Sequence, residues 1–231
     1  MQMTQKELMP LFSPTCYLKS GILLVSPSDF GKLEGRILSG NRLFMLVSRG
    51  KLSLDVMGRK YEIKAHAFLD VLDSVTLRIE NFSSDLQAWG CFITFEFATE
   101  SLKNLRPGPQ GYLLERLNIP VQELSEKECN ILEQQLRLLR ECLADMKHYY
   151  RQELTQLYFK SFSLELGNIM LSHSEETDTF TPHVNKYDFL TLNFLKLVSK
   201  HFATQHAVDF YAERRVRPLQ IADSPGRQSN R

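Results

Sequence analysis

The sequence contains little cysteine, has no long apolar run and carries almost no net charge. Its four cysteines, Cys16, Cys91, Cys129 and Cys142, have no CxxC spacing and so do not suggest a zinc site. No apolar run approaches the roughly 20 residues needed to span a bilayer. The start, MQMTQKELMPLF, lacks the basic end and apolar centre of a secretory signal. We therefore expect a cytoplasmic protein with reduced, mostly buried thiols.

The motifs of common catalytic and cofactor sites are missing as well. The chain has no GxSxG, HExxH, Walker-type loop or dinucleotide glycine pattern. Its strand-rich first half holds a single histidine, His66, whereas a divalent metal needs several histidines or carboxylates that converge. With a net charge of +1, any contact with DNA would have to come from a local patch. We expect no catalytic residues, no metal site and no cofactor.

The composition present is that of an ordinary globular protein, with 43% apolar and 24% charged residues among 231. From Thr15 to about Ala98 the pattern is one of short strands and turns. Leu43–Val47 is a continuous apolar run, and Leu52–Val56 alternates apolar and polar residues before a turn at Gly58. The remaining candidate strands are Cys16–Leu18, Ile22–Val25, Tyr61–Ile63, Phe68–Leu72, Val75–Ile79 and Ala88–Phe97. Closely spaced short strands without a long helix predict an all-β sandwich or barrel.

A linker at Ser101–Pro120, which contains prolines and glycines, separates these strands from a helical region, so the fold class is α+β. The first helix is predicted from Ser125 to Met146, where Ser125 and Glu128 form a capping box. A polar loop at Ser172–Lys186 and a third helix from Tyr187 to about Phe202 come later. The second helix, from Tyr149 to about Leu171, is predicted to have one apolar side: Tyr150, Leu154, Leu157, Phe162, Leu166, Ile169 and Met170.

The first of these helices carries a narrow apolar seam. The seam residues recur at alternating three- and four-residue spacings, which is typical of an interface between two helices. The same spacing also fits an ordinary amphipathic helix that lies on its own core, and periodicity does not separate these alternatives. On the first alternative the chain is a homodimer through the Ser125–Met146 helix, with these residues at the interface: Cys129, Leu132, Leu136, Leu139, Leu143 and Met146.

The order of these elements resembles an AraC-type transcriptional regulator. A β region and paired helices are followed by a helix that leads into the stretch HFATQHAVDFYAE at residues 201–213, which is similar to the lead into the first helix-turn-helix of that family. The strand GCFITFEF at residues 90–97 fits the family's N-terminal half as well. The resemblance covers about Thr15 to Glu213.

The resemblance implies a cupin-like effector-binding domain with its linker (1–120), a helical dimerisation pair (121–172) and a helix with the start of a helix-turn-helix domain (184–213). The composition of the last residues, with two prolines, a glycine and many polar groups, predicts a disordered tail (214–231). The sequence after Glu213 departs from the family pattern, because RVRPLQIADSPGRQSNR cannot supply two helix-turn-helix modules. We therefore expect the DNA-binding domain to be incomplete. In the tail, Arg214 and Arg215 are candidates for contact with DNA phosphate, and a solvated tail is the alternative.

An effector pocket in the sandwich is the remaining candidate site. The family implies a small-molecule effector, and Phe44, Trp89 and Phe92 are candidates to line its pocket. Alternation along the strand places Trp89 and Phe92 on opposite faces, so the three cannot all line one cavity. The alternative is that these aromatic side chains fill the core.

The main hypothesis is an AraC-type regulator represented by its effector-sensing and dimerisation portion. A stand-alone cupin-type metabolite-binding protein or enzyme is the first alternative. A DNA-binding protein with an unusual C-terminus is the second, and it requires specific operator affinity that survives moderate salt.

Overall fold

The structure is a computed structural model, and it describes residues 2–73, 75–105, 120–176 and 210. The chain divides into two compact units, Met1–Asp178 and Thr179–Arg231. The second unit lies outside the described residues except for Phe210. The predicted segments 184–213 and 214–231 therefore cannot be compared with the structure. No described helix is long and apolar enough to cross a membrane.

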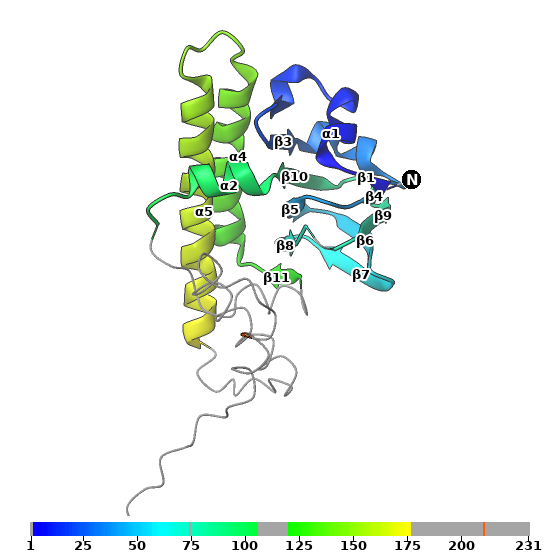
Figure 1. The fold of residues 1–231 in the computed structure, drawn as a ribbon. Helices are drawn as coiled ribbons and strands as arrows, with labels where there is room; N and C mark the ends of the chain where they lie inside the picture. The colour runs from blue at the N-terminus through cyan, green and yellow to red at the C-terminus, as the bar shows by residue number, and fades with distance from the viewer. Residues whose placement is uncertain (1, 74, 106–119, 177–209, 211–231) are drawn as a thin grey trace, which may run out of the picture. The chain divides into compact units, whose positions relative to one another are not determined.

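The first unit is a mixed α and β structure with two β-sheets (Figure 1). The five-stranded sheet has the order β1-β4-β9-β6-β7, and the six-stranded sheet has the order β11-β8-β5-β10-β3-β2. The strands are β1 (Gln2–Met3), β2 (Tyr17–Leu18), β3 (Ile22–Val25), β4 (Ile37–Leu38), β5 (Arg42–Arg49), β6 (Lys51–Val56), β7 (Arg59–Lys64), β8 (Ala67–Val71), β9 (Leu77–Phe82), β10 (Gln87–Ile93) and β11 (Val121–Glu123). The helices are α1 (Gln5–Leu8), α2 (Phe95–Ser101), α4 (Glu126–Ala144) and α5 (Arg151–Glu176), with 3-10 turns η1 (Met9–Leu11), η2 (Pro14–Cys16) and η3 (Pro27–Leu33).

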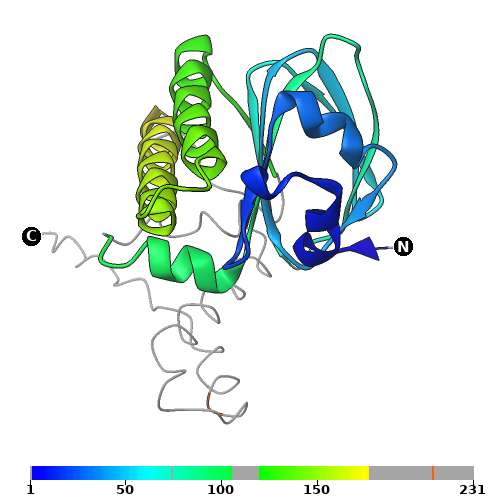
Figure 2. The same ribbon diagram turned by 90° about the horizontal axis from the view of Figure 1, so that it is seen from above.

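The two sheets share one core, and helices α2, α4 and α5 cover the opposite face of the six-stranded sheet (Figure 2). Alternate residues of β5 point in opposite directions: Leu43 and Met45 enter the core between the sheets, whereas Phe44 and Leu46 face the helices. A strand buried on both faces needs apolar side chains at every position, which explains the continuous run Leu43–Val47. β6 has one buried face, so it alternates.

The predicted strand Ala88–Phe97 is wrong at its C-terminal end, because β10 stops at Ile93 and a helix begins. The Thr94 hydroxyl accepts a hydrogen bond from the Phe97 backbone N–H at 3.2 Å, which satisfies one of the unpaired donors of the first helical turn. The Phe97 side chain is buried, whereas Phe95 points outward and is exposed. Because Thr94 lies among residues that favour strands, the sequence pattern did not indicate that it caps a helix.

Candidate functional site

The helical hairpin formed by α4 and α5 is the feature that distinguishes this unit from a bare pair of sheets. The two helices run side by side across the outer face of the six-stranded sheet, and α2 crosses α5 (Figure 1). The predicted capping box at the start of α4 is confirmed: the Glu128 carboxylate accepts from the Ser125 backbone N–H at 2.7 Å, and the Ser125 hydroxyl accepts from the Glu128 N–H at 3.3 Å. This cap fixes where the hairpin leaves β11.

The apolar seam of α4 faces the interior of its own unit, not a second subunit. The seam residues join one core with the outer face of the six-stranded sheet and with Phe159 and Phe162 of α5. In this conformation they are therefore unavailable to a second subunit. The structure agrees with the alternative that α4 is an amphipathic helix packed on its own core. Met146 lies beyond the end of α4 and is half exposed. The buried members are Cys129, Leu132, Leu136, Leu139 and Leu143.

The structure does not bring the three candidate pocket aromatics together. Phe92 lies in the core between the sheets, whereas Phe44 and Trp89 lie on the helix-facing side. The Phe44 ring packs on Phe68, Phe159 and Phe162, with ring centroids 5.6–6.5 Å apart. These contacts between two strands and α5 fasten the hairpin to the sheet. The three residues therefore lie on two faces of the six-stranded sheet, as alternation along the strand predicts for Trp89 and Phe92, and their role in binding an effector stays a prediction.

Trp89 contacts the other helix of the hairpin. Its indole Nε1 donates to Glu133 Oε1 at 3.4 Å, and the Arg137 guanidinium lies 5.9 Å from the ring centroid. Arg137 also pairs with Glu133 at 2.7 Å. The single tryptophan therefore anchors α4 through a polar contact at the edge of the apolar core.

A partly buried ion pair beside Phe44 is a feature that the sequence pattern did not reveal. Arg42 Nε donates to Asp70 Oδ1 at 2.8 Å, and the Asp70 side chain is fully buried. The guanidinium of Arg42 also lies 4.9 Å from the centroid of the Phe44 ring. Asp70 is the one charged residue in the apolar run Phe68–Leu72. A charged residue is rarely buried without a partner, so this position could have indicated an ion pair from the sequence.

Two polar contacts tie the last turns of α5 to the start of α4 and to β11. His173 Nε2 lies 2.8 Å from Glu128 Oε1, and His173 Nδ1 lies 3.1 Å from Gln122 Nε2. Burial raises the pKa of Glu128, but hydrogen bonds from Ser125 and then His173 outweigh this effect, so the pKa lies below its ordinary value. The carboxylate thus stays charged and holds both helices.

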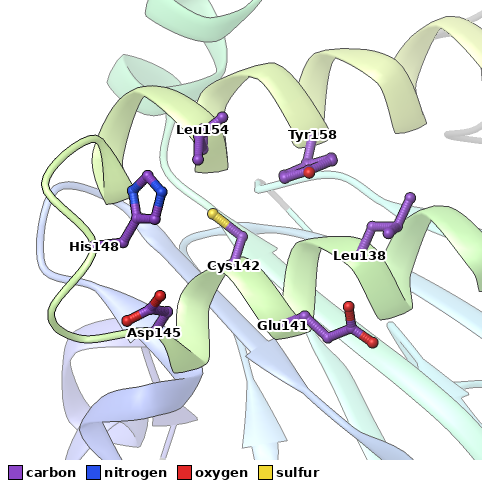
Figure 3. Close-up of a pocket in the computed structure, with 7 residues that line it drawn as sticks. All are labelled: Leu138, Glu141, Cys142, Asp145, His148, Leu154 and Tyr158. Carbon is purple, nitrogen blue, oxygen red and sulfur yellow. The ribbon is translucent and has the colours of Figure 1, made fainter.

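A shallow groove of about 230 Å³ runs between the ends of α4 and α5 that meet at the connecting turn (Figure 3). Its walls are largely apolar on the α5 side, and the carboxylates of Glu141 and Asp145 stand at its rim. Cys142 lies at its base, and its thiol sits 3.7 Å from the Arg151 carbonyl. The full lining is Leu138, Glu141, Cys142, Asp145, His148, Leu154 and Tyr158.

The other thiols are buried, as expected. Burial raises the pKa of Cys91, and burial together with the nearby Glu133 carboxylate raises the pKa of Cys129 to about 11. Within the described residues no three His, Cys, Asp or Glu side chains are grouped so that they could hold a metal ion. His66 lies in a turn with a φ of 60°, where its carbonyl accepts from the Leu124 N–H. Arg214 and Arg215 lie outside the described residues.

No protein-family model matches the chain, and no curated protein matches it significantly. Several solved structures are similar to it at low scores. An apo form of ToxT from Vibrio cholerae, carrying a single substitution, has 8% identity and a TM-score of 0.43, with 85% of this chain and 70% of that chain covered. Wild-type ToxT with bound unsaturated fatty acid has 10% identity and a TM-score of 0.35, covering 86% and 70%. The AraC-like transcriptional activator CuxR has 13% identity and a TM-score of 0.34, covering 84% and 71%.

Proposed function

We propose that the chain is the effector-sensing and association portion of an AraC-type transcriptional regulator, and that it is not an enzyme. The observation that carries this proposal is the α4–α5 hairpin, which is fastened to one sheet and precedes the residues that resemble the lead into a helix-turn-helix. A β unit joined rigidly to a pair of helices is an arrangement that can pass a change in the sheet to the helices. The regulator acts on transcription through the association of chains.

The aromatic contacts between sheet and hairpin supply the route for such a change. Phe44 and Phe68 on adjacent strands pack against Phe162 of α5, and Phe97 of α2 packs against Phe159 with centroids 5.3 Å apart. Because protein cores are close-packed, a strand that shifts displaces the helix in contact with it. The effector itself is a small molecule on this proposal. Its place in the β unit rests on the sequence resemblance, because Phe44, Trp89 and Phe92 share no cavity.

Contact with DNA by this chain stays a prediction, because the family's DNA-binding modules would follow the part of the chain that resembles it. The residues concerned, including Arg214 and Arg215, follow Glu213, where the sequence departs from the family pattern. On this proposal the chain regulates by pairing, either with itself or with a relative that carries a helix-turn-helix. A gel-shift experiment in which added protein leaves such a relative's DNA binding unchanged would contradict pairing with that relative.

The proposed function is tested in the source organism and on the purified protein. Deleting the gene should change a small set of transcripts, and restoring the wild-type gene should reverse the change. The Leu139→Glu variant, which places a carboxylate in the core and should not fold, is the control that should fail to restore it. Purified protein should hold less than one equivalent of iron, zinc and manganese by mass spectrometry. One equivalent of any of them, with unchanged transcripts, would favour the cupin-type enzyme instead.

A further inference from the structure

The groove between the ends of α4 and α5 combines apolar walls with two carboxylates (Figure 3). Leu154 and Tyr158 point across from α5, and Cys142 lies between them at the base. The polar groups below the base bond to one another, because the Thr155 hydroxyl donates to the Arg151 carbonyl at 2.7 Å and lies 3.6 Å from Cys142 Sγ. The base therefore offers apolar contact to an occupant, and polar recognition is left to the rim.

The rim of the groove carries negative charge. Within the described part of the chain Glu141 has no ion pair, and the Asp145 carboxylate accepts from the Lys147 backbone N–H at 3.2 Å. His148 adds no positive charge in this arrangement. Its Nδ1 accepts from the Tyr150 backbone N–H at 3.1 Å, and a ring nitrogen that accepts belongs to a neutral imidazole.

The basic side chains near this end of the hairpin are committed to other partners. Arg137 pairs with Glu133 at 2.7 Å. Arg140 and Arg151 each donate to a backbone carbonyl at 2.9 Å, so both guanidinium groups hold the unit itself together. Lys147 is exposed and is not among the residues that line the groove. The two carboxylates of the rim therefore keep their charge without a neighbouring cation to balance it.

The placement of these two carboxylates opposes the stability of α4. Glu141 lies in the last turn of the helix and Asp145 is its C-cap residue, where the partial negative charge of the helix end disfavours an anion. The two residues are also four positions apart, a spacing at which like charges on a helix repel. No basic residue lies in the last turn of α4. Charges that oppose the local fold are typical of functional positions, and a bound cation would relieve both effects.

We propose that the groove binds a small organic cation, an amine with an aromatic or short alkyl body. The ammonium group lies beside the two carboxylates of the rim, and the body packs on Leu138, Leu154 and Tyr158. The volume of about 230 Å³ is below the roughly 300–1,000 Å³ of sites for drug-sized ligands, so the occupant is small. The site lies on the hairpin, away from the effector pocket that the sequence resemblance implies in the β unit. The inference therefore goes beyond the proposed function and does not depend on it.

The thiol of Cys142 reports whether the groove is occupied. Iodoacetamide, a neutral reagent, should alkylate Cys142 of the native full-length chain more slowly when a ligand covers the base, with intact mass as the readout. Phenethylamine should halve the rate at about 1 mM, an affinity that suits so small a ligand in an open site. 2-Phenylethanol, which has the same body without the charge, and 3-phenylpropionate, which is an anion, should each need roughly tenfold more. Equal protection by the three compounds, or protection by none of them, would overturn the proposal.

Two substitutions separate binding from folding. Glu141→Gln and Asp145→Asn keep the shape of the side chain and remove its charge. Each should weaken phenethylamine about threefold and leave 2-phenylethanol unchanged. Each should also raise the melting temperature of the ligand-free protein by about 1 °C, because the repulsion at the helix end is relieved. Glu126→Gln, exposed at the opposite end of α4, should not change the binding of phenethylamine.

The opposite result for these variants would overturn the proposal. Glu141→Gln and Asp145→Asn proteins that bind phenethylamine as tightly as the wild type would show that the carboxylates do not recognise the cation. Variants that melt at a lower temperature than the wild type would show that the carboxylates stabilise the fold.

Dilution distinguishes the amine from another occupant of the groove. If Cys142 of the ligand-free protein reacts more slowly as the protein concentration rises, a second copy of the chain covers the groove, and the proposal is overturned. If Cys142 reacts as slowly as the three buried thiols at every concentration, the groove is filled without added ligand, and the proposal is overturned as well. The transcript experiment would stand in either case, since it does not depend on this groove.

Discussion

Replacing Leu139 with alanine distinguishes a helix buried in its own unit from a helix buried between two copies. Leu139 is 0% exposed within the single chain, in the core between α4, α5 and the sheet. A leucine truncated to alanine at such a site costs about 2–5 kcal/mol, because the apolar contact is lost and a cavity remains. We take about 3 kcal/mol as the central value. With a urea dependence of about 2 kcal/mol per molar, the midpoint falls by about 1.5 M.

The adjacent residue provides a matched control. Leu138 has the same side chain on the same helix but is 42% exposed at the groove. Leu138→Ala should change the free energy of unfolding by less than about 0.5 kcal/mol. Both variants are unfolded in urea at equal protein concentration, with circular dichroism as the readout, and their association is measured by sedimentation velocity. Leu139→Ala should lower stability without a specific loss of association.

The opposite pattern would refute the reasoning. If Leu139→Ala dissociated the protein while the midpoint, corrected for protein concentration, stayed at the wild-type value, the α4 seam would be an interface after all. The intrachain packing of Leu139 against α5 and the sheet would then not describe the protein in solution.

Three other changes probe single contacts. Ser125→Ala should lower the free energy of unfolding by about 1 kcal/mol because the cap of α4 is lost. Folding lowers the pKa of Glu128, so the stabilisation by its carboxylate is present above the unfolded pKa of about 4.3 and is lost as the pH falls through the folded pKa. Thermal unfolding should therefore show a smaller difference between wild type and variant at about pH 3 than at about pH 7. Gly21→Ala should cost about 2 kcal/mol or more by urea unfolding, because φ is +134° and the new Cβ would overlap Thr94 Oγ1; wild-type stability would contradict this close approach. Of the four cysteines, Cys142 alone should react rapidly with a thiol reagent in the native protein, whereas all four should react in urea, and two fast native thiols would contradict the burial of the others.

Local pattern and composition accounted for most of the secondary structure. The predicted hairpin at Leu52–Ile63 is present as β6 and β7, which pair from Lys51 opposite Lys64 to Val56 opposite Arg59. The start of α4 followed from Ser125 and Glu128, because a capping box is made by residues three apart in the chain. At Phe95–Phe97 the prediction was wrong because two local signals compete. The apolar residues there favour a longer strand, whereas Thr94 caps a helix and ends the strand before them.

The faces of the helices could not be assigned in this way. The predicted apolar side of the second helix combined Tyr150, Leu154 and Leu157 with Phe162 and Leu166, and the structure places the first three outward or at the edge and the last two in the core. Both sets have helical spacing, so periodicity could not rank them. Their difference arises from contacts with Phe44 and Phe68, which lie far away in the sequence.

The sequence by itself determined that short strands come first, that paired amphipathic helices follow, and where the first of these helices begins. Each of these properties depends on residues within a few positions of one another. Only the tertiary structure decided that the α4 seam lies inside its own unit, that Phe44 and Trp89 face the helices while Phe92 faces the other sheet, and that Tyr150 and Leu157 are exposed. The physical reason is that burial depends on which distant surfaces meet, and an apolar face has the same spacing whether it meets its own sheet or a second molecule.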